Sequence, residues 1–440
     1  MITEIWTFTV HYCTGSDHSG LPPGVRPRMM VGAMVRPYET KDLKQSLRIF
    51  HEIGWMEGKD TDKDIFNAYI DGGASFVAEL SGEVEVFVVT RTGACRYLNS
   101  DIPFSAVTGV ATSRVARQQG LAGKVAVHAI AESANNGAAM SMLGMFDQGY
   151  YDKFGFGNTV NHRIATFDPA YLKAPRLTRA PKRLSKDDAK AMHDCRCRRK
   201  RYHGGCTLNG AGETLATTIW EEKSFGLGFE SKKGELTHFL WIKPKAEHGP
   251  YNIWFSSWET HEQLIELLSV LKSLSDQVHG IRMADPPRLE MQDFLSRPLA
   301  TLRARRGGDF DSDVVSQIWM QCRILDLPVC VGAMKLCGEP VAFNLELNDP
   351  IEKYLNEADG WKGIGGNWIV RLSDTSTATK GHDESLETIS CTVNDFSRIW
   401  FGSSTAEAVS VTGDFTASEK LIQAIDRIVC VPAPIVDWDF

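Results

Sequence analysis

The chain reads Val110-Ala-Thr-Ser-Arg-Val-Ala-Arg-Gln-Gln-Gly-Leu-Ala122 at the end of an apolar strand, and an amphipathic helix follows at once. A helix N-terminus has four backbone N–H groups without partners and carries about half a positive charge, so it attracts anions. Gly120 lets the backbone approach a ligand closely, and Arg117 adds a fixed positive charge. The stretch therefore predicts a pyrophosphate-binding loop, with an ordinary strand–turn–helix as the alternative.

Two other nucleotide-binding patterns are absent from this stretch. It lacks the Gly-x-Gly-x-x-Gly of dinucleotide-binding domains, and it lacks the Gly-Lys-Ser/Thr of a P-loop.

Composition narrows the class of protein. The 440 residues suggest two to four domains, and 43% apolar with 23% charged residues is typical of soluble globular chains. A net charge of −7 argues against wholesale binding of nucleic acid. No apolar run approaches the ~18 residues of a membrane span, and the N-terminus lacks a signal-peptide pattern. Ten scattered cysteines do not form a disulfide framework, so we expect a cytoplasmic, reduced protein.

Hydrophobic periodicity predicts an α/β (α+β) chain in three parts. Residues 1–30 have no clear periodicity and are expected to be an N-terminal extension. In the first part we expect strands at 34–37, 75–80, 84–90 and 139–145, and helices at 41–52 and 121–134.

Residues 166–186 are rich in proline, lysine and arginine and are interpreted as a crossover between domains. The second part predicts strands at 226–230, 236–243 and 251–256, and a helix at 262–278 that a Thr260–Gln263 capping box opens. The charged stretch from Arg303 marks the next boundary. The third part predicts strands at 341–347 and 368–372, helices at 393–400 and 418–428, and a proline-braced, aromatic and acidic terminus.

The strand, the loop and the helix around Gly120 together resemble motif A of the GNAT acyltransferases, with Arg114 where that family usually has proline. About thirty residues later comes Tyr150-Tyr-Asp-Lys-Phe-Gly-Phe-Gly157. A Tyr-x-x-Phe-Gly-Phe/Tyr-Gly segment at this distance resembles the Eis (enhanced intracellular survival) family. Further segments agree with that family: 99–110, Ile281-Arg-Met-Ala-Asp-Pro-Pro, Val411-Thr-Gly-Asp-Phe and the closing Asp439-Phe440.

This resemblance covers residues 31–440 and implies a domain order. It implies a GNAT acetyl-CoA-binding catalytic domain at 31–170 and a second GNAT-like domain without a cofactor loop at 171–302. A domain that resembles a sterol carrier protein (SCP2-like) follows at 303–440 and ends in the catalytic C-terminus. Acetyl-CoA as acyl donor, a small-molecule amine as acceptor and a homo-oligomer, in particular a hexamer, are also implied. We expect no metal, nucleic acid or membrane partner.

The resemblance also assigns roles to particular residues. Tyr151 would be the general acid, or else a structural tyrosine packed on the sheet, and the terminal carboxylate of Phe440 would be the general base. The residues expected to bind the cofactor are Val110, Ala111, Thr112, Arg117, Gln118, Gln119, Gly120, Leu121, Ala122, Gly123, Phe146 and Asp147.

Elementary acid–base chemistry tests those roles. Tyrosine, with a pKa near ~10, suits proton donation to a thiolate whose conjugate acid lies near ~8.5. A free α-carboxylate has a pKa of ~3.5 and an alkylammonium a pKa of ~10. Direct proton transfer from the ammonium to the carboxylate is therefore unfavourable by about 9 kcal/mol. The carboxylate must therefore be buried, or it positions the amine and passes the proton through water.

Weaker patterns leave alternatives open. Glu52, Trp55 and Asp439 are candidates for a cationic-substrate pocket, because carboxylates and a Trp face attract ammonium groups, or they have plain surface or core roles. The cluster of Cys195, Cys197 and Cys206 with neighbouring histidines suggests zinc, but its spacing is short, and a structural role is the alternative we favour. For the basic run 196–201 we favour a solvated helix face over contact with nucleic acid.

Three functions follow from these features. The first is an acetyl-CoA-dependent N-acetyltransferase (acyltransferase, EC 2.3.1) acting on a primary amine such as an aminoglycoside, a polyamine or a lysine-like amine. The second is a lipid or small-molecule carrier that uses the C-terminal domain, and the third is a scaffold without catalytic activity.

Overall fold

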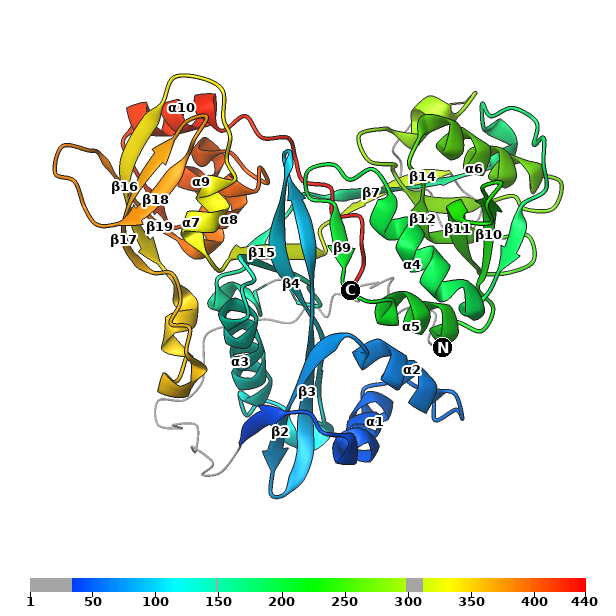
Figure 1. Cartoon of the computed structure of the whole chain (residues 1–440), viewed down its shortest axis with the longest axis horizontal. Coiled ribbons are helices and arrows are strands. Elements are labelled where there is room, and N and C mark those ends of the chain that lie inside the picture. The colour runs from blue at the N-terminus through cyan, green and yellow to red at the C-terminus, as the bar shows by residue number, and fades with distance from the viewer. Residues whose placement is uncertain (1–33, 148, 298–311) are drawn as a thin grey trace, which may run out of the picture.

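The computed structural model describes residues 34–147, 149–297 and 312–440, and these residues form three sheets flanked by helices (Figure 1). The expected extension 1–30 and the boundary stretch that begins at Arg303 lie outside the described residues. Among the helices that are described, none is long and apolar enough to cross a membrane.

The first sheet runs in the order β1-β2-β3-β4-β5-β15-β6, with β9 paired to β3. Its strands are β1 (Val35–Pro37), β2 (Gly73–Leu80), β3 (Glu83–Tyr97), β4 (Ser100–Thr112), β5 (Met140–Gly144), β6 (Gly157–Asn158), β9 (Cys206–Leu208) and β15 (Met320–Ile324). Helix α3 (Leu121–Asn135) covers one face, where Val86 and Val88 point. Helices α1 (Leu43–Glu52) and α2 (Asp62–Ile70) cover the other face, where Phe87 and Val89 point.

The second sheet runs in the order β14-β7-β13-β12-β11-β10-β8. Its strands are β14 (Asp313–Gln317), β7 (His162–Phe167), β13 (Ile281–Ala284), β12 (Tyr251–Ser257), β11 (Leu236–Pro244), β10 (Phe225–Glu230) and β8 (Lys182–Leu184). Successive side chains of β11 point to opposite faces of the sheet. Leu240 packs under α6 (His261–Ser273) on one face, and Trp241 packs under α4 (Ala189–Arg198) on the other. Helix α5 (Gly212–Trp220) lies against α2, the helix that packs on the first sheet.

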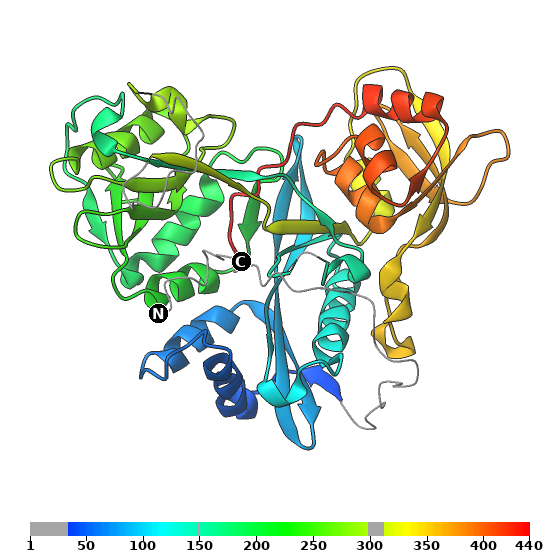
Figure 2. The same cartoon turned by 180° about the vertical axis from the view of Figure 1, so that it is seen from behind.

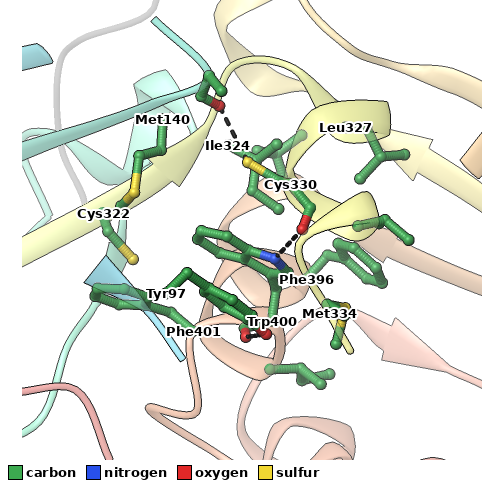
Figure 3. Packing of buried hydrophobic residues seen from close by; sticks show 14 of the residues in the cluster. Tyr97, Met140, Cys322, Ile324, Leu327, Cys330, Met334, Phe396, Trp400 and Phe401 are labelled. Carbon is green, nitrogen blue, oxygen red and sulfur yellow. Dashed lines mark hydrogen bonds between the residues drawn. The ribbon is translucent and has the colours of Figure 1, made fainter. Parts of the chain in front are cut away.

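The third sheet runs in the order β18-β17-β16-β19-β20. Its strands are β16 (Val341–Asn348), β17 (Gly366–Leu372), β18 (Thr377–Lys380), β19 (Thr388–Thr392) and β20 (Phe415–Thr416). The helices of this part of the chain are α7 (Leu327–Gly332), α8 (Val393–Trp400), α9 (Ala406–Thr412) and α10 (Glu419–Ile428). Its core continues into the first sheet (Figure 3), where Tyr97 stacks on Trp400 with 4.7 Å between ring centroids and donates a hydrogen bond to its carbonyl.

The sheets divide the chain at other positions than the predicted 170 and 303. Strand β7 precedes residue 170, yet it pairs in the second sheet. Strands β14 and β15 follow residue 303, yet they complete the second and the first sheet. The reason is that each sheet receives a strand from a distant part of the chain, which local periodicity does not reveal.

The last residues, 429–440, run without helix or strand from α10 to the middle of the molecule (Figures 1 and 2). Both views place the C-terminus beside β9, between the first and second domains.

Candidate active site

A break in strand pairing opens the first sheet. β4 and β5 pair in parallel from Phe104–Met140 to Val107–Leu143, and β5 then continues along β15. On the other side of β4, Gly109 and Val110 together lie opposite the single residue Val88, which is a β-bulge. The β5-facing edge of residues 108–112 is therefore left for a ligand with amide groups, such as a pantetheine arm.

Gly109 makes this bulge possible. Its φ of +62° lies in the left-handed region, and a Cβ there would come within 2.9 Å of the Tyr69 hydroxyl oxygen. That hydroxyl is 2.7 Å from Oγ1 of Thr108. Helix α2 thus contacts β4 at the bulge itself, on the face opposite α3.

The predicted pyrophosphate loop lies directly after this edge. Gln118 (φ +60°) and Gly120 (φ +75°) turn the chain into α3, whose first N–H groups belong to residues 120–123. Arg117 to Gly120 are exposed, and no atom lies within 4 Å of a Cβ built on Gly120. The residues present fit an anion at this helix N-terminus.

Arg114 explains a departure from the family pattern. Its backbone N–H donates to Glu52 at 2.9 Å, which proline would be unable to do, and its guanidinium donates to the Glu52 carbonyl. Glu52 is therefore held by the segment that joins β4 to α3. Trp55 packs edge-on against Phe50, 5.2 Å between centroids. Asp439 lies in the field of Arg196, so the structure gives these three substrate candidates different neighbours.

Tyr151 lies in an aromatic cluster beside α3. Its ring is 3% exposed and contacts Phe146, Tyr150 and Phe156. Burial raises the pKa of the Tyr151 hydroxyl, with smaller contributions from Tyr150 and Tyr69. Within the described residues the hydroxyl has no hydrogen-bond partner.

The Tyr151 segment and the loop meet at Gly123. A Cβ there would be 3.1 Å from the Phe154 ring and 3.9 Å from the Tyr150 hydroxyl. Phe146 is 55% exposed and Asp147 is exposed, so both remain free to contact a ligand beside β5.

Residues of the C-terminal region hold this segment in place. Asn394 on α8 donates to the carbonyls of Asp152 and Phe156, at 2.8 and 2.7 Å. Arg323 on β15 donates to the Phe154 carbonyl and forms a fully buried ion pair with Asp349, 2.7 Å long. Sequence reasoning missed these side chains, because each lies more than 160 residues from the backbone it binds.

The C-terminal residues reach the first domain. The Phe440 ring packs on Phe104 of β4 with 5.9 Å between centroids and is 6% exposed. Burial raises the pKa of the Asp439 carboxyl to about 7, because desolvation outweighs the opposing charge of Arg196.

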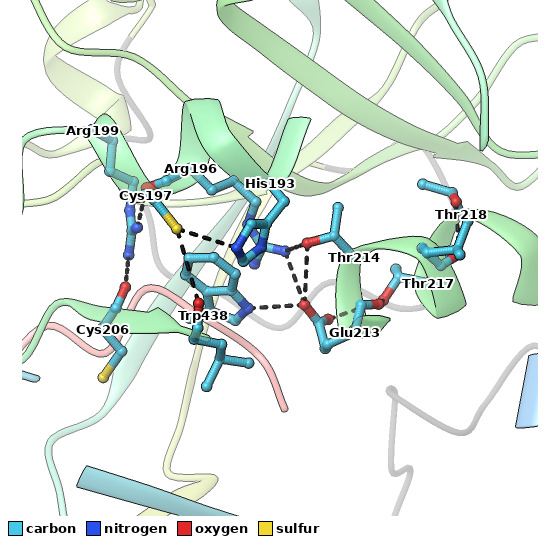
Figure 4. A network of polar contacts seen from close by, with 12 residues as sticks. His193, Arg196, Cys197, Arg199, Cys206, Glu213, Thr214, Thr217, Thr218 and Trp438 are labelled. Carbon is cyan, nitrogen blue, oxygen red and sulfur yellow. Dashed lines mark hydrogen bonds and ion pairs between the residues drawn. The ribbon is translucent and has the colours of Figure 1, made fainter. Parts of the chain in front are cut away.

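The residues just before the terminus bind the second domain (Figure 4). Arg199 makes a bidentate ion pair with Asp437, at 2.9 and 2.5 Å. The Trp438 indole N–H donates to Glu213 at 2.9 Å, and the Arg196 guanidinium lies 3.8 Å from its ring centroid.

The interpretation of 196–201 as a solvated helix face is therefore wrong for Arg196 and Arg199, which are 3% and 8% exposed. Their partner is an acidic, aromatic tail almost 240 residues further along the chain. A local signal existed, because the composition of the terminus already differed from that of a loose end, but nothing in the sequence paired the two.

The cysteines do not converge on one point. Cys197 is 3.4 Å from His193 Nε2, whereas Cys195 contacts Ser257 at the same distance. Cys206 lies opposite Cys95 in the first sheet. Burial raises the pKa of Cys195 to about 11, which disfavours the thiolate that zinc requires. Among the described residues, no three His, Cys, Asp or Glu side chains are grouped to hold a metal ion.

Comparison with known proteins agrees with this geometry. Residues 34–159 match the model of the acetyltransferase (GNAT) domain family. No curated protein sequence matches the chain.

Three solved structures share the fold over 93% of this chain. One is a conserved protein of Enterococcus faecalis V583 described as a probable N-acyltransferase, with a TM-score of 0.75 and 16% identity over 100% of that chain. A GCN5-related N-acetyltransferase from Anabaena variabilis has a TM-score of 0.75 and 12% identity, again over 100% of its length. Eis1 from Mycobacterium abscessus has a TM-score of 0.70 and 15% identity over its whole length.

The fold and the site define a class. The first domain is a GNAT acetyltransferase domain, and the protein is an acyltransferase enzyme whose acyl donor is acetyl-CoA. The three solved structures share the overall fold of this chain over 93% of its length, which includes the second and third sheets.

Proposed function

We propose that the protein transfers an acetyl group from acetyl-CoA to a primary amine of the aminoglycoside, polyamine or lysine-like class. The observation that carries this proposal is the open edge of β4 after Val107, which lies directly before the exposed N-terminus of α3. An extended pantetheine arm suits the strand edge, and a pyrophosphate suits the helix N-terminus.

The reaction would proceed by direct attack of the amine on the thioester carbonyl. Backbone N–H groups at 110–112 would bind pantetheine and stabilise the developing oxyanion near Ala111. Residues 117–123 would hold the pyrophosphate, with Phe146 and Asp147 at the side of the cofactor. A bulge aims these backbone groups away from the regular ladder, which supports the assignment.

Tyr151 would donate a proton to the departing thiolate. Burial raises its pKa, so the phenol is protonated at neutral pH. The same dry surroundings make the thiolate more basic, so the two groups stay matched as donor and acceptor.

The terminal carboxylate of Phe440 would act as the general base. Two observations support this role: the Phe440 ring is buried against β4 of the catalytic domain, and desolvation of this segment raises the pKa of the adjacent Asp439 to about 7. If the terminal carboxylate is desolvated in the same way, it would accept a proton more readily than a carboxylate in water.

The carrier alternative is less well supported. The largely apolar core of the third domain contains a void of about 10 Å³, lined by residues such as Phe343, Phe396 and Trp400. This is about the space of one water molecule, and an acyl chain needs far more.

We also propose the finer family assignment. Agreement with Eis1 over its whole length supports an Eis-like enzyme with a second GNAT-like domain and an SCP2-like third domain. The hexamer that the Eis resemblance implies remains a prediction.

Release of CoA thiol tests the proposal. The protein is incubated with acetyl-CoA and a panel of polyamines, aminoglycosides and lysine peptides, and free thiol is followed over time. Tyr151→Phe should lower kcat by about 10²-fold or more, as loss of a general acid does, while the dissociation constant for acetyl-CoA stays within twofold.

Tyr150→Phe is the matched control, because the neighbouring ring keeps its packing and should keep most of the activity. Thiol release that no amine accelerates would contradict acetyl transfer to amines. An undiminished kcat in Tyr151→Phe would remove Tyr151 as the acid.

A further inference from the structure

The final six residues of the chain, Ile435–Phe440, bind as a ligand would to a surface formed by α4, α5 and the segment that leads into β9. The Ile435 N–H donates to the His203 carbonyl at 2.8 Å. A Cβ on Gly204 (φ +89°) would be 2.5 Å from the Ile435 nitrogen, so only glycine lets the tail pass this close. The second domain is therefore shaped around the tail, although its sequence contains no cofactor loop.

The acidic contact is made at Asp437. Its carboxylate accepts two hydrogen bonds from Arg199 and a third from the Cys206 N–H at 3.1 Å. Arg199 also donates to the carbonyls of Arg196 and Cys206, so two backbone groups orient its guanidinium toward the tail. A planar guanidinium held in this way recognises a carboxylate by both position and direction.

The aromatic contact is made at Trp438, which is 1% exposed. Arg196 lies over the indole ring, and Glu213 accepts both the indole N–H at 2.9 Å and an Arg196 N–H at 3.1 Å. The ring thus closes a buried cation–carboxylate pair from α4 and α5, which is a specific site for one aromatic residue with an N–H donor.

We infer that this surface, the tail clamp of Arg196, Arg199 and Glu213, positions the terminal carboxylate for the proposed reaction. The second domain would then contribute to catalysis by holding the tail, without binding a cofactor itself. Arg196, Arg199 and Glu213 would be positioning residues, since they act through Asp437 and Trp438. The inference rests on the proposed role of Phe440 as general base.

Chain statistics set the size of the expected effect. Residues 429–440 form a 12-residue segment without helix or strand, and an unanchored chain of that length spreads its end over roughly 20 Å. Anchored at Trp438, only the last two residues remain to move. Effective concentration falls as about the −3/2 power of length, so complete release of the tail would lower kcat by about 15-fold, which is the upper limit for loss of the clamp.

Variants of the full chain test this prediction. Arg199→Ala removes the Asp437 contact and leaves that of Trp438, so it should lower kcat by up to about 15-fold and leave the KM for acetyl-CoA within twofold. Lys200→Ala is the matched control, since the exposed side chain next to Arg199 does not contact the tail. Arg199→Lys should recover part of kcat, because a single charged contact to Asp437 remains.

A peptide experiment separates the clamp from the base. The chain is truncated after Pro434, and its folding is checked by circular dichroism against the full-length protein. A synthetic peptide with the sequence Ile-Val-Asp-Trp-Asp-Phe is then added, and binding is measured by calorimetry and turnover by thiol release. We expect saturable binding and recovery of turnover at the same peptide concentrations.

Three altered peptides distinguish the outcomes. Peptides with Asp437→Asn or Trp438→Ala should bind at least tenfold more weakly, and this result supports the clamp. Equal binding of either peptide, or full kcat in Arg199→Ala, would overturn it. A peptide amidated at its C-terminus should bind normally yet restore no turnover. If the amidated peptide restores turnover, the proposed base is wrong, while the binding data still decide the clamp.

Discussion

Burial gives the candidate residues their chemical character. Tyr151 is 3% exposed, and desolvation raises the pKa of its hydroxyl, which keeps the phenol protonated at neutral pH. Burial also raises the pKa of Asp439, to about 7, and this makes its carboxylate a stronger base than a carboxylate in water. Tyr151 is surrounded by rings of its own segment, whereas Asp439 lies near Arg196 and Glu213, which are distant in the sequence.

The raised pKa of Asp439 predicts a pH-dependent stability. The folded protein binds the Asp439 proton up to about pH 7, whereas the unfolded chain releases it near pH 4. Between these values the folded state holds more protons, so its stability falls as pH rises. Asp439→Asn removes this effect, and the stability of the native protein relative to the variant should therefore fall from pH 5 to pH 7 and level off above.

Thermal unfolding midpoints of both proteins at pH 5, 6, 7 and 8 measure this difference. The slope cannot exceed about 1.4 kcal/mol per pH unit for one proton. Parallel curves over the whole range would show that Asp439 does not titrate near neutrality.

At the scale of secondary-structure elements, the bulge in β4 and the loop before α3 shape the candidate site. β4 leaves β5 after Val107, the bulge at Gly109 turns the strand, and Gly120 starts α3 in the left-handed region. Each of these features places backbone groups rather than side chains, so the proposed cofactor site depends on glycine at two positions.

Gly109→Ala tests the role of the bulge. A residue with a Cβ at φ +62° is strained by roughly 1–2 kcal/mol, and the new Cβ would also press on Tyr69. A shift of the bulge by about 1 Å should lower kcat/KM for acetyl-CoA by between 10- and 100-fold. Gly82→Ala is the control, because its φ of +84° carries similar strain but its Cβ meets no atom within 4 Å. Equal kcat/KM values in the two variants would contradict a catalytic role for the bulge.

Local elements were predicted well where the sequence contains its own signals. α3 was expected at 121–134 and spans Leu121–Asn135, and the capping box of Thr260 and Gln263 opens α6 as predicted. α6 ends at Ser273 rather than 278, because a 3-10-like turn follows. The basic run was expected on a solvated helix face, and α4 does end at Arg198, but the burial of Arg196 was not predicted, because its partners Glu213 and Trp438 come from α5 and the C-terminal tail.

The candidate site shows the same division between local and distant information. The loop at 117–123 and the Tyr151 segment were predicted from short motifs, and the structure brings them together at Gly123. Tyr69, Asn394 and the tail clamp were missed, because no motif links α2, α8 or α4 to the residues they contact.

At the scale of the whole molecule, all three domains contribute to one site. The first domain supplies the strand edge and the loop, and the third supports the Tyr151 segment through Asn394. The second holds the tail through Arg199, and the tail ends on Phe104 of the first domain. The C-terminal tail links these contributions, because it leaves the third domain, contacts the second and ends on the first.

Chain extension after Phe440 tests the central claim most directly. Adding one alanine moves the terminal carboxylate and replaces it by a peptide bond at Phe440, while Phe440→Leu keeps both the carboxylate and an apolar contact with Phe104. The two proteins are compared by steady-state thiol release with an accepted amine and by calorimetric binding of acetyl-CoA. The account predicts that the extended chain loses about 10²-fold or more in kcat with unchanged acetyl-CoA affinity, whereas Phe440→Leu keeps most of its activity. Full turnover by the extended chain would contradict it.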